Sequence, residues 1–299
     1  MQRPFARTGC TLLLLALSLG CQAQSFRAYI ASFGSDSNPC TVDQPCRLLP
    51  AAIDAVAVNG EIWMLDSANF NSGTVDVTKS VSIRAIPGQV GSIVAVRGGA
   101  AMNLSPGVTV RMQNVAILNN AVSPGMNGIV MTTGSLSIQD SFVSVPGDGI
   151  QVSGGSVEVR NVSFRDLASG VHAMGNSTVD VTGSKFVDTS YVAVYLEGNV
   201  ASTTTVASVS DSSFTNCEMS LGANQTASGS VLKGMLSRAS VTNCSFGVST
   251  TGAGATINVG RSSFINDGIA FGGTGVESMG DNQVRMNGAT GTVTTVAPM

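Results

Sequence analysis

The stretches 157–166 (VEVRNVSFRD) and 179–188 (VDVTGSKFVD) repeat one pattern of apolar and polar residues. In each stretch two valines flank an acidic residue, and a phenylalanine follows five positions after the second valine. Alternation with a period of two places the apolar side chains on one face of a short strand. The pattern therefore predicts a strand, a turn at polar residues and a second strand in each repeat.

The same pattern returns along most of the chain. Similar segments begin at residues 108, 136, 207 and 257, and glycine-apolar-x-apolar pieces (GIVM, GIQV, GVHA, GIAF) follow several of them. A repeat of roughly 20 to 28 residues cannot bury an apolar face alone, but stacked repeats can. We therefore expect an all-β parallel β-helix of about nine coils. The positions taken as equivalent are Val110, Ile138, Val159, Val181, Val209 and Val259, each with an apolar partner five residues later, and more weakly Leu236 with Val241 and Met279 with Val284.

Composition excludes one class of partner. Charged residues make up 11% of the 299 residues, the formal net charge is -3, and the chain has few lysines, so clusters of positive charge are scarce. Affinity for nucleic acid depends on such clusters. The sequence predicts no nucleic-acid partner, and no segment approaches the roughly 20 apolar residues of a transmembrane helix.

The first residues predict export. Arg3 and Arg7 precede an apolar run and a small-residue cleavage zone, so we expect residues 1–23 to be a signal peptide and the protein to be secreted, periplasmic or on the outer cell surface. An alternative cleavage before Cys21, in a sequence that resembles a lipoprotein box, would give a lipid anchor.

The remaining cysteines are expected to be structural. Cys40 and Cys46 lie in PCTVDQPC, and in an oxidising compartment a disulfide is the simplest assignment for them. A metal site would need two more ligands, and the single histidine is far away in sequence, so no metal is predicted. Cys217 and Cys244 lie one coil apart in similar TNC contexts, which is compatible with a second disulfide or with buried thiols.

The segment after the first cysteine loop predicts a helix that caps the solenoid. In LLPAAIDAVAVNG, Pro50 suits the first turn, the apolar residues form one stripe, and Gly60 ends the helix. A terminal coil exposes apolar core and strand edges, and a helix can cover them. The expected organisation is a disulfide loop and capping helix at 24–60, the β-helix at 61–287 and a tail at 288–299.

Several segments near the N-terminus carry a resemblance. YIASFGSDSNPC (29–40), PCRLLPAAIDAV (45–56), NGEIWMLDSANFNSG (59–73) and VTKSVSIRA (77–85) together resemble secreted bacterial β-helix proteins of the pectin-lyase-like superfamily. The resemblance implies a right-handed parallel β-helix. Lyases with this fold use a lysine or arginine base near acidic residues that bind calcium, whereas other members are adhesins or have no assigned activity, so the resemblance implies no activity by itself.

The candidate ligand-binding residues are few. The outward positions of the glycine-apolar-x-apolar strands are Val130, Gln151, His172 and Ala270, of which His172 alone titrates near neutral pH. A lone outward histidine such as His172 is more often an ordinary surface residue than a binding residue. An aspartate before glycine, as in PGDGI, more often stabilises a turn than binds calcium. The candidates are Asp148, Gln151, His172, Lys185 and the tyrosine expected to be most exposed, Tyr195.

Three functions remain compatible with the sequence. The first is a non-catalytic exported β-helix without cofactors that binds a polysaccharide or cell-surface glycan, or serves as a structural module. The second is a polysaccharide lyase or related enzyme, for which calcium is expected and Asp148, Asp166 or Lys185 lie close together. The third is an adhesin-like surface protein. A carboxylate cluster on the outer surface would favour the second.

Overall fold

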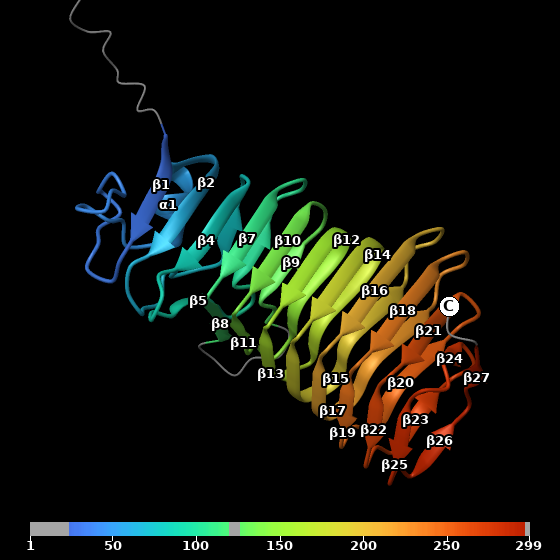
Figure 1. Cartoon of the computed structure of the whole chain (residues 1–299). Coiled ribbons are helices and arrows are strands. Elements are labelled where there is room, and N and C mark those ends of the chain that lie inside the picture. Colours follow the sequence, from blue (N-terminus) through green and yellow to red (C-terminus); the bar gives the residue numbers. More distant parts are fainter. Residues whose placement is uncertain (1–23, 120–125, 297–299) are drawn as a thin grey trace, which may run out of the picture.

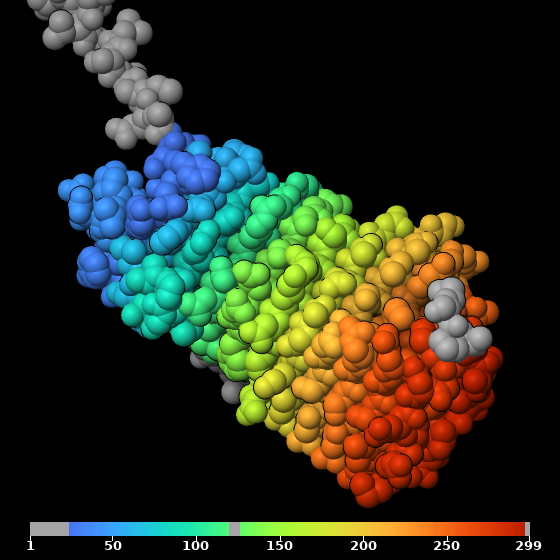
Figure 2. Space-filling view, viewed as in Figure 1, coloured from blue at the N-terminus to red at the C-terminus, as the bar shows by residue number. Residues whose placement is uncertain are grey.

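The structure is a computed structural model that describes residues 24–119 and 126–296. These residues wind into an elongated right-handed parallel β-helix of about nine turns, which runs from the blue N-terminal end to the red C-terminal end (Figure 1). In the space-filling view the successive coils form oblique stripes across the rod (Figure 2). The predicted signal peptide and the alternative anchor at Cys21 lie outside the described residues.

All strand pairings are parallel, and they divide the coil into three faces. The first face consists of β1 (Ser25–Ile30), β2 (Val56–Met64), β4 (Val81–Ala85), β7 (Thr109–Gln113), β10 (Ser135–Gln139), the later parts of β12 (Asp148–Arg160) and β14 (Ser169–Thr182), β16 (Thr204–Ser210), β18 (Val231–Ser237), β21 (Ala255–Gly260), β24 (Val276–Ser278) and β27 (Thr294–Thr295).

The second face consists of β5 (Gly91–Ala95), β8 (Val115–Asn119), β11 (Phe142–Val143), β13 (Ser163–Leu167), the first parts of β15 (Lys185–Gly198) and β17 (Ser213–Gln225), β19 (Ser240–Thr242), β22 (Ser263–Ile265) and β25 (Gln283–Arg285). The third face consists of β3 (Val75–Val77), β6 (Met102–Leu104), β9 (Ile129–Met131), the first parts of β12 and β14, the later parts of β15 and β17, β20 (Phe246–Thr251), β23 (Ile269–Gly272) and β26 (Ala289–Gly291).

The core is built from columns of similar side chains. Phe164, Phe186 and Phe214 occupy one position of the second face in successive coils and are fully buried. The Phe186 ring lies 4.7 Å from Phe164 and 4.9 Å from Phe214 between centroids, with nearly parallel planes. The predicted period and the inward positions in the middle of the chain are thus confirmed.

At both ends the predicted equivalence is wrong. Ile138 pairs with Met112, not Val110, because the apolar residues of 108–112 alternate and a shift by two residues leaves the same face inward. At the C-terminal end Val259 pairs with Ser278 rather than Met279, since a serine there replaces the expected apolar residue. The pairing of Val284 with the phenylalanine column is confirmed.

The predicted helix is present but short. Helix α1 (Leu49–Ala55) lies at the N-terminal end of the rod and packs against β1, β2 and β3, with Leu49 and Ile53 buried (Figure 1). It ends at Ala55, not near Gly60, because the β-branched Val56 begins the strand β2 that pairs with β1. The residues from Val56 to Gly60, which the sequence assigns to the helix, therefore belong to the strand β2.

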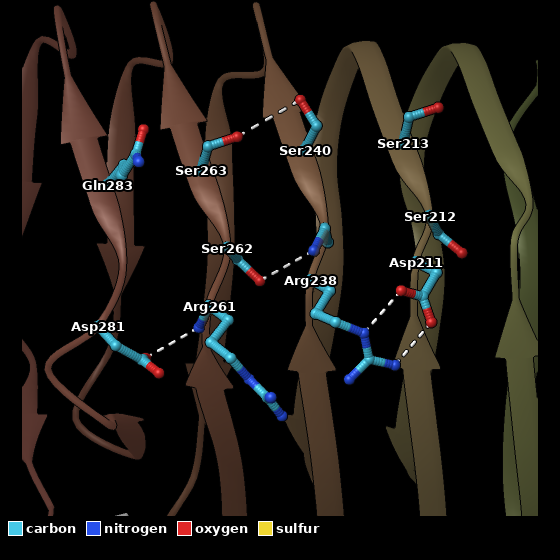
Figure 3. A pocket seen from close by; sticks show the side chains of 11 residues that line it. Asp211, Ser212, Ser213, Arg238, Ser240, Arg261, Ser262, Ser263, Asp281 and Gln283 are labelled. Carbon is cyan, nitrogen blue, oxygen red and sulfur yellow. Dashed lines mark hydrogen bonds and ion pairs between the residues drawn. The ribbon is translucent and has the colours of Figure 1, made fainter.

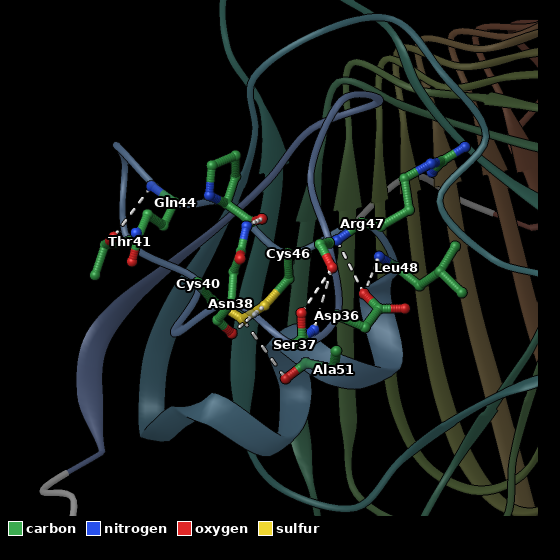
Figure 4. Close-up of a disulfide and its surroundings, with 12 residues drawn as sticks. Asp36, Ser37, Asn38, Cys40, Thr41, Gln44, Cys46, Arg47, Leu48 and Ala51 are labelled. Atoms are coloured by element: carbon green, nitrogen blue, oxygen red, sulfur yellow. Dashed lines mark hydrogen bonds between the residues drawn. A yellow bond between two sulfur atoms is a disulfide. The ribbon is translucent and has the colours of Figure 1, made fainter.

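The predicted disulfide Cys40–Cys46 is present, and Cys217 and Cys244, for which the sequence left a disulfide or buried thiols open, also form a disulfide. Cys40–Cys46 lies beside α1, and the loop is tied to the helix because the Asp36 carboxylate accepts hydrogen bonds from the backbone N–H groups of Arg47 and Leu48 (Figure 4). Cys217–Cys244 joins two neighbouring coils, with Cα atoms 4.4 Å apart. The described residues form no helix long and apolar enough to cross a membrane. The segment 288–299, which the sequence predicts to be a tail, contains the strands β26 and β27.

Candidate functional site

One column of outward side chains on the third face changes its chemistry from coil to coil. The backbone register aligns Gln151 on β12 with His172 on β14, Tyr195 on β15 and then Gly222 on β17 and Ser249 on β20. Three of the candidate residues are therefore stacked neighbours. The equivalent of Ala270 in this column is instead Gly272, and Ala270 itself is buried.

His172 lies between two carboxylates. Its Nδ1 is 2.8 Å from Asp148 Oδ2 and its Nε2 is 2.9 Å from Glu197 Oε2. The exposed fractions of the three side chains are 14%, 16% and 25%. We call these three residues the histidine cluster; His172 is a partly buried bridge between coils and not a lone surface residue.

The geometry favours the protonated ring. A neutral imidazole has one N–H donor, so one of its nitrogens would face a carboxylate with a lone pair, whereas an imidazolium donates to both. Burial alone lowers the pKa of His172, but the hydrogen bond and charge of Asp148, followed by those of Glu197, outweigh burial and raise the pKa above its ordinary value of 6.5.

A hydrogen-bond chain holds the cluster in place. The Asp148 backbone N–H donates to Asn127 Oδ1, and Asn127 Nδ2 donates to Gln151 Oε1, both at 3.0 Å. Asp148 begins strand β12 and uses its carboxylate for His172, so the prediction that it serves turn chemistry is wrong. The chain links Gln151, Asp148, His172 and Glu197 across three coils.

Tyr195 packs on the histidine ring. The two ring centroids are 4.8 Å apart, and the Tyr191 and Tyr195 centroids are 5.3 Å apart with the rings in an edge-on, T-shaped arrangement. Burial mainly raises the pKa of Tyr195, so its hydroxyl keeps its proton at neutral pH, and it accepts a hydrogen bond from Asn224 Nδ2 at 3.3 Å. Tyr195 is 6% exposed, which contradicts its expected exposure, whereas Tyr191 is 47% exposed.

A hollow of about 170 Å³ opens beside the tyrosines. The outward column has no side chain at Gly222, where a Cβ would stand 2.7 Å from Met219 Sδ. The Glu218 carboxylate borders the hollow and accepts a hydrogen bond from Ser245 Oγ at 2.7 Å. We call this hollow the tyrosine hollow. It is lined by Tyr191, Val192, Tyr195, Glu218, Met219, Gly222, Ala223, Asn224, Ser249 and Thr251.

Lys185 lies elsewhere. It begins β15 on the second face, next to Ser163 and Ser213 in the neighbouring coils, and its ammonium makes no ion pair with any described residue. The carboxylate that joins Asp148 at the histidine cluster is Glu197, not Asp166. Within residues 24–119 and 126–296, no group of three or more His, Cys, Asp or Glu side chains is arranged to hold a metal ion.

Trp63, the single tryptophan, does not offer an aromatic binding surface comparable to the tyrosine hollow. The guanidinium carbons of Arg27 and Arg84 lie 4.3 and 5.1 Å from the centroid of the Trp63 ring, and Trp63 Nε1 donates to Glu61. The ring is thus already covered by cationic side chains. This makes the tyrosine hollow the better candidate for an aromatic binding surface.

Sequence reasoning missed four residues of the site. Asn127, Glu197, Glu218 and Asn224 reach it from coils whose lengths differ, so no local pattern marks them. One signal was available: aligning GIQV, GVHA and AVYL by their apolar positions, with alanine in place of the first glycine, places Tyr195 beside His172.

Comparison with known proteins shows the fold. No family model matches the sequence, and no curated protein matches it significantly. Among solved structures, XylC in complex with xylose has a TM-score of 0.57 at 8% identity and covers 87% of this chain and 70% of its own. ORF18 of Geobacillus virus E2 has a TM-score of 0.55 at 12% identity, covering 91% of this chain and 61% of its own.

A third similar structure is the GH136 lacto-N-biosidase from Eubacterium ramulus, with a TM-score of 0.51, 10% identity and coverage of 91% and 67%. At these identities the likeness shows a shared parallel β-helix fold and not a shared activity. It is the fold that the resemblance to the pectin-lyase-like superfamily implies.

Proposed function

We propose that the protein is an exported β-helix that binds a glycan at the tyrosine hollow. The observation that carries the proposal is the pair Tyr191 and Tyr195 beside the Asn224 amide and the Glu218 carboxylate. A sugar ring presents apolar C–H faces that pack on aromatic rings, and hydroxyl groups that hydrogen bond to amides and carboxylates.

Two further observations support this proposal. Structures that share the fold include one solved with xylose and one named as a lacto-N-biosidase, so this fold holds sugars in other proteins. The two disulfides suit an oxidising compartment, where cell-surface glycans and secreted polysaccharides are found.

The test is binding of the purified chain to a panel of neutral and acidic polysaccharides by affinity gel electrophoresis. Tyr191→Ala should weaken binding roughly fivefold, because about 1 kcal/mol of aromatic packing is lost from an exposed ring. Phe33→Ala is the matched control, because Phe33 is 75% exposed and belongs to the N-terminal loop. Equal binding of Tyr191→Ala and wild type to every ligand would contradict the proposal.

We keep a glycan-cleaving enzyme as a second candidate because of the histidine cluster. A histidine between two carboxylates can release a proton as an imidazolium and take one up as a neutral imidazole, which is what general acid-base catalysis uses. The test is release of reducing ends and of unsaturated products from the same panel, with and without added calcium. Activity that His172→Gln abolishes would support this candidate, and absence of activity across the panel would remove it for those substrates.

We also infer that α1 shields the apolar end of the first coil, as the sequence predicts. Its buried Leu49 and Ile53 face the core of that coil. Ile53→Ser should expose apolar surface and increase the binding of a hydrophobic dye. Unchanged dye binding and an unchanged melting temperature would contradict a shielding role.

A further inference from the structure

The corner between the first and second faces changes its residue type in the last coils. The backbone at this corner is left-handed in successive coils, with φ between 50° and 62°. In the earlier coils the corner position holds residue types that tolerate this conformation, namely Asn114, Asp140, Asn161, Gly183 and Asp211. In the next two coils the same position is Arg238 and Arg261, with φ of 50° and 51°.

Two arginines at this corner are unfavourable by themselves. Arginine gains none of the local hydrogen bonds that let asparagine and aspartate adopt left-handed backbone. Stacked like charges one coil apart also repel each other. Backbone strain of this kind concentrates at functional sites. The replacement of Asn, Asp and Gly by arginine therefore points to a role in binding a ligand.

The two arginines line a surface hollow with a volume of about 670 Å³. Figure 3 shows Asp281, Arg261, Arg238 and Asp211 in one row across successive coils, next to a row of serines. We call this the arginine hollow. It lies at the corner of the first and second faces, whereas the tyrosine hollow lies on the third face.

The acidic residues of the hollow are already engaged. Arg238 donates from Nε and Nη2 to the two carboxylate oxygens of Asp211, both at 2.6 Å, and these hydrogen bonds lower the pKa of Asp211. Asp281 accepts a hydrogen bond from the Arg261 backbone N–H at 2.8 Å. Both carboxylates therefore have donors within the hollow.

The Arg261 side chain is different. Its guanidinium makes no hydrogen bond or ion pair with any described residue, and it extends toward the neighbouring Arg238 (Figure 3). Ser240 and Ser263 lie two residues after Arg238 and Arg261 in the chain, with their hydroxyls 3.5 Å apart, on the side away from the Arg261 guanidinium (Figure 3). A guanidinium with free donors matches the oxygens of a planar carboxylate or a tetrahedral sulfate.

We propose that the arginine hollow binds an oxyanion substituent, a carboxylate or a sulfate group, carried by a glycan. Arg261 donates charge-assisted hydrogen bonds to the oxyanion, and the positive charge of Arg238 adds to the attraction. The inference rests on the proposed function for the glycan. The net charge of -3 gives no general attraction for anions, so binding depends on this local group.

The experiment compares one polymer backbone with three substituents: dextran, carboxymethyl dextran and dextran sulfate, each titrated calorimetrically at one ionic strength. The charged polymers should bind, and dextran should not bind at this hollow. Arg261→Asn should weaken the charged interaction roughly tenfold, the value of one charge-assisted contact. Its melting temperature should equal or exceed that of wild type, because asparagine suits the left-handed backbone.

The matched control is Arg97→Asn, which removes one charge from an exposed turn in the N-terminal half. Binding of carboxymethyl dextran or dextran sulfate that Arg261→Asn weakens and Arg97→Asn leaves unchanged supports the proposal and identifies the oxyanion. Equal affinities of Arg261→Asn and wild type, or equal losses in both variants, would overturn it.

The same titration separates this site from the tyrosine hollow. Loss of glycan binding in Tyr191→Ala, with none in Arg261→Asn, would overturn the arginine site and leave the proposed function standing. Loss in Arg261→Asn, with none in Tyr191→Ala, would support an anion site and contradict the glycan-binding role of the tyrosines.

Discussion

Two columns of side chains, one inside the coil and one outside it, follow the same stacking rule with different results. Inside, the second face repeats Phe164, Phe186 and Phe214, and each ring packs on a copy of itself. Outside, the third face places His172 and Tyr195 in one column with residues unlike either of them. The interior must fill one shape in every coil, whereas the exterior has no such constraint, so variation outside marks positions that packing does not dictate.

Breaking the interior column should have the largest effect. Phe186→Ala removes the central ring of a fully buried stack, and we expect a loss of about 4 kcal/mol in the free energy of unfolding. Guanidinium denaturation followed by circular dichroism measures it. Phe33→Ala, at an exposed ring, should change the free energy by less than about 0.5 kcal/mol. Similar losses in both variants would show that the column does not carry the stability assigned to it.

The contrast explains what the sequence could predict. The period, the strand positions and the burial of Phe186 follow from alternation, because the core repeats one requirement in each coil. The register of residues 108–112 does not follow, since several apolar residues alternate there and packing decides between them. Near the C-terminus, Ser278 occupies a core position that alternation assigns to an apolar residue.

The site was harder to predict than the fold. The sequence marks Asp148, Gln151, His172 and Tyr195 by separate local features, and the structure brings them together, whereas Lys185 lies on another face. Glu197 is 25 residues from His172, and its position beside the ring depends on the length of one coil. Local patterns cannot supply such partners, because the distance between them in space is set by stacking and not by sequence separation.

Removing the central residue of the outer column should have the second largest effect. His172→Gln leaves the carboxylates of Asp148 and Glu197 partly buried without their shared cation, and we expect a loss of about 2 kcal/mol in the free energy of unfolding. Adding Glu197→Gln to this variant removes one uncompensated charge and should recover part of the loss. A double variant as unstable as the sum of the two single variants would contradict this account of the cluster.

A change of pH breaks the same contact without a mutation. The folded-state pKa of His172 is raised, so its contribution to stability is complete below about pH 6.5, the pKa of an unperturbed histidine, and is lost as the pH rises through the folded-state pKa. The free energy of unfolding of wild type minus that of His172→Gln should therefore decrease between pH 6 and pH 9. A difference that stays constant or grows over this range would show that the ring is not protonated in the folded protein.

The smallest effect is expected where the outer column is made more uniform. Gln151 lies beside Val130 of the preceding coil, so Gln151→Val would stack two valines and raise the strand preference of the position. The variant loses the hydrogen bond from Asn127 Nδ2, but Asn127 Oδ1 still accepts from the Asp148 backbone. These changes oppose each other, and denaturation should show a difference within about 0.5 kcal/mol. A loss near that of Phe186→Ala would mean that the outer column is under the same packing constraint as the core, and the inference from its variation would fail.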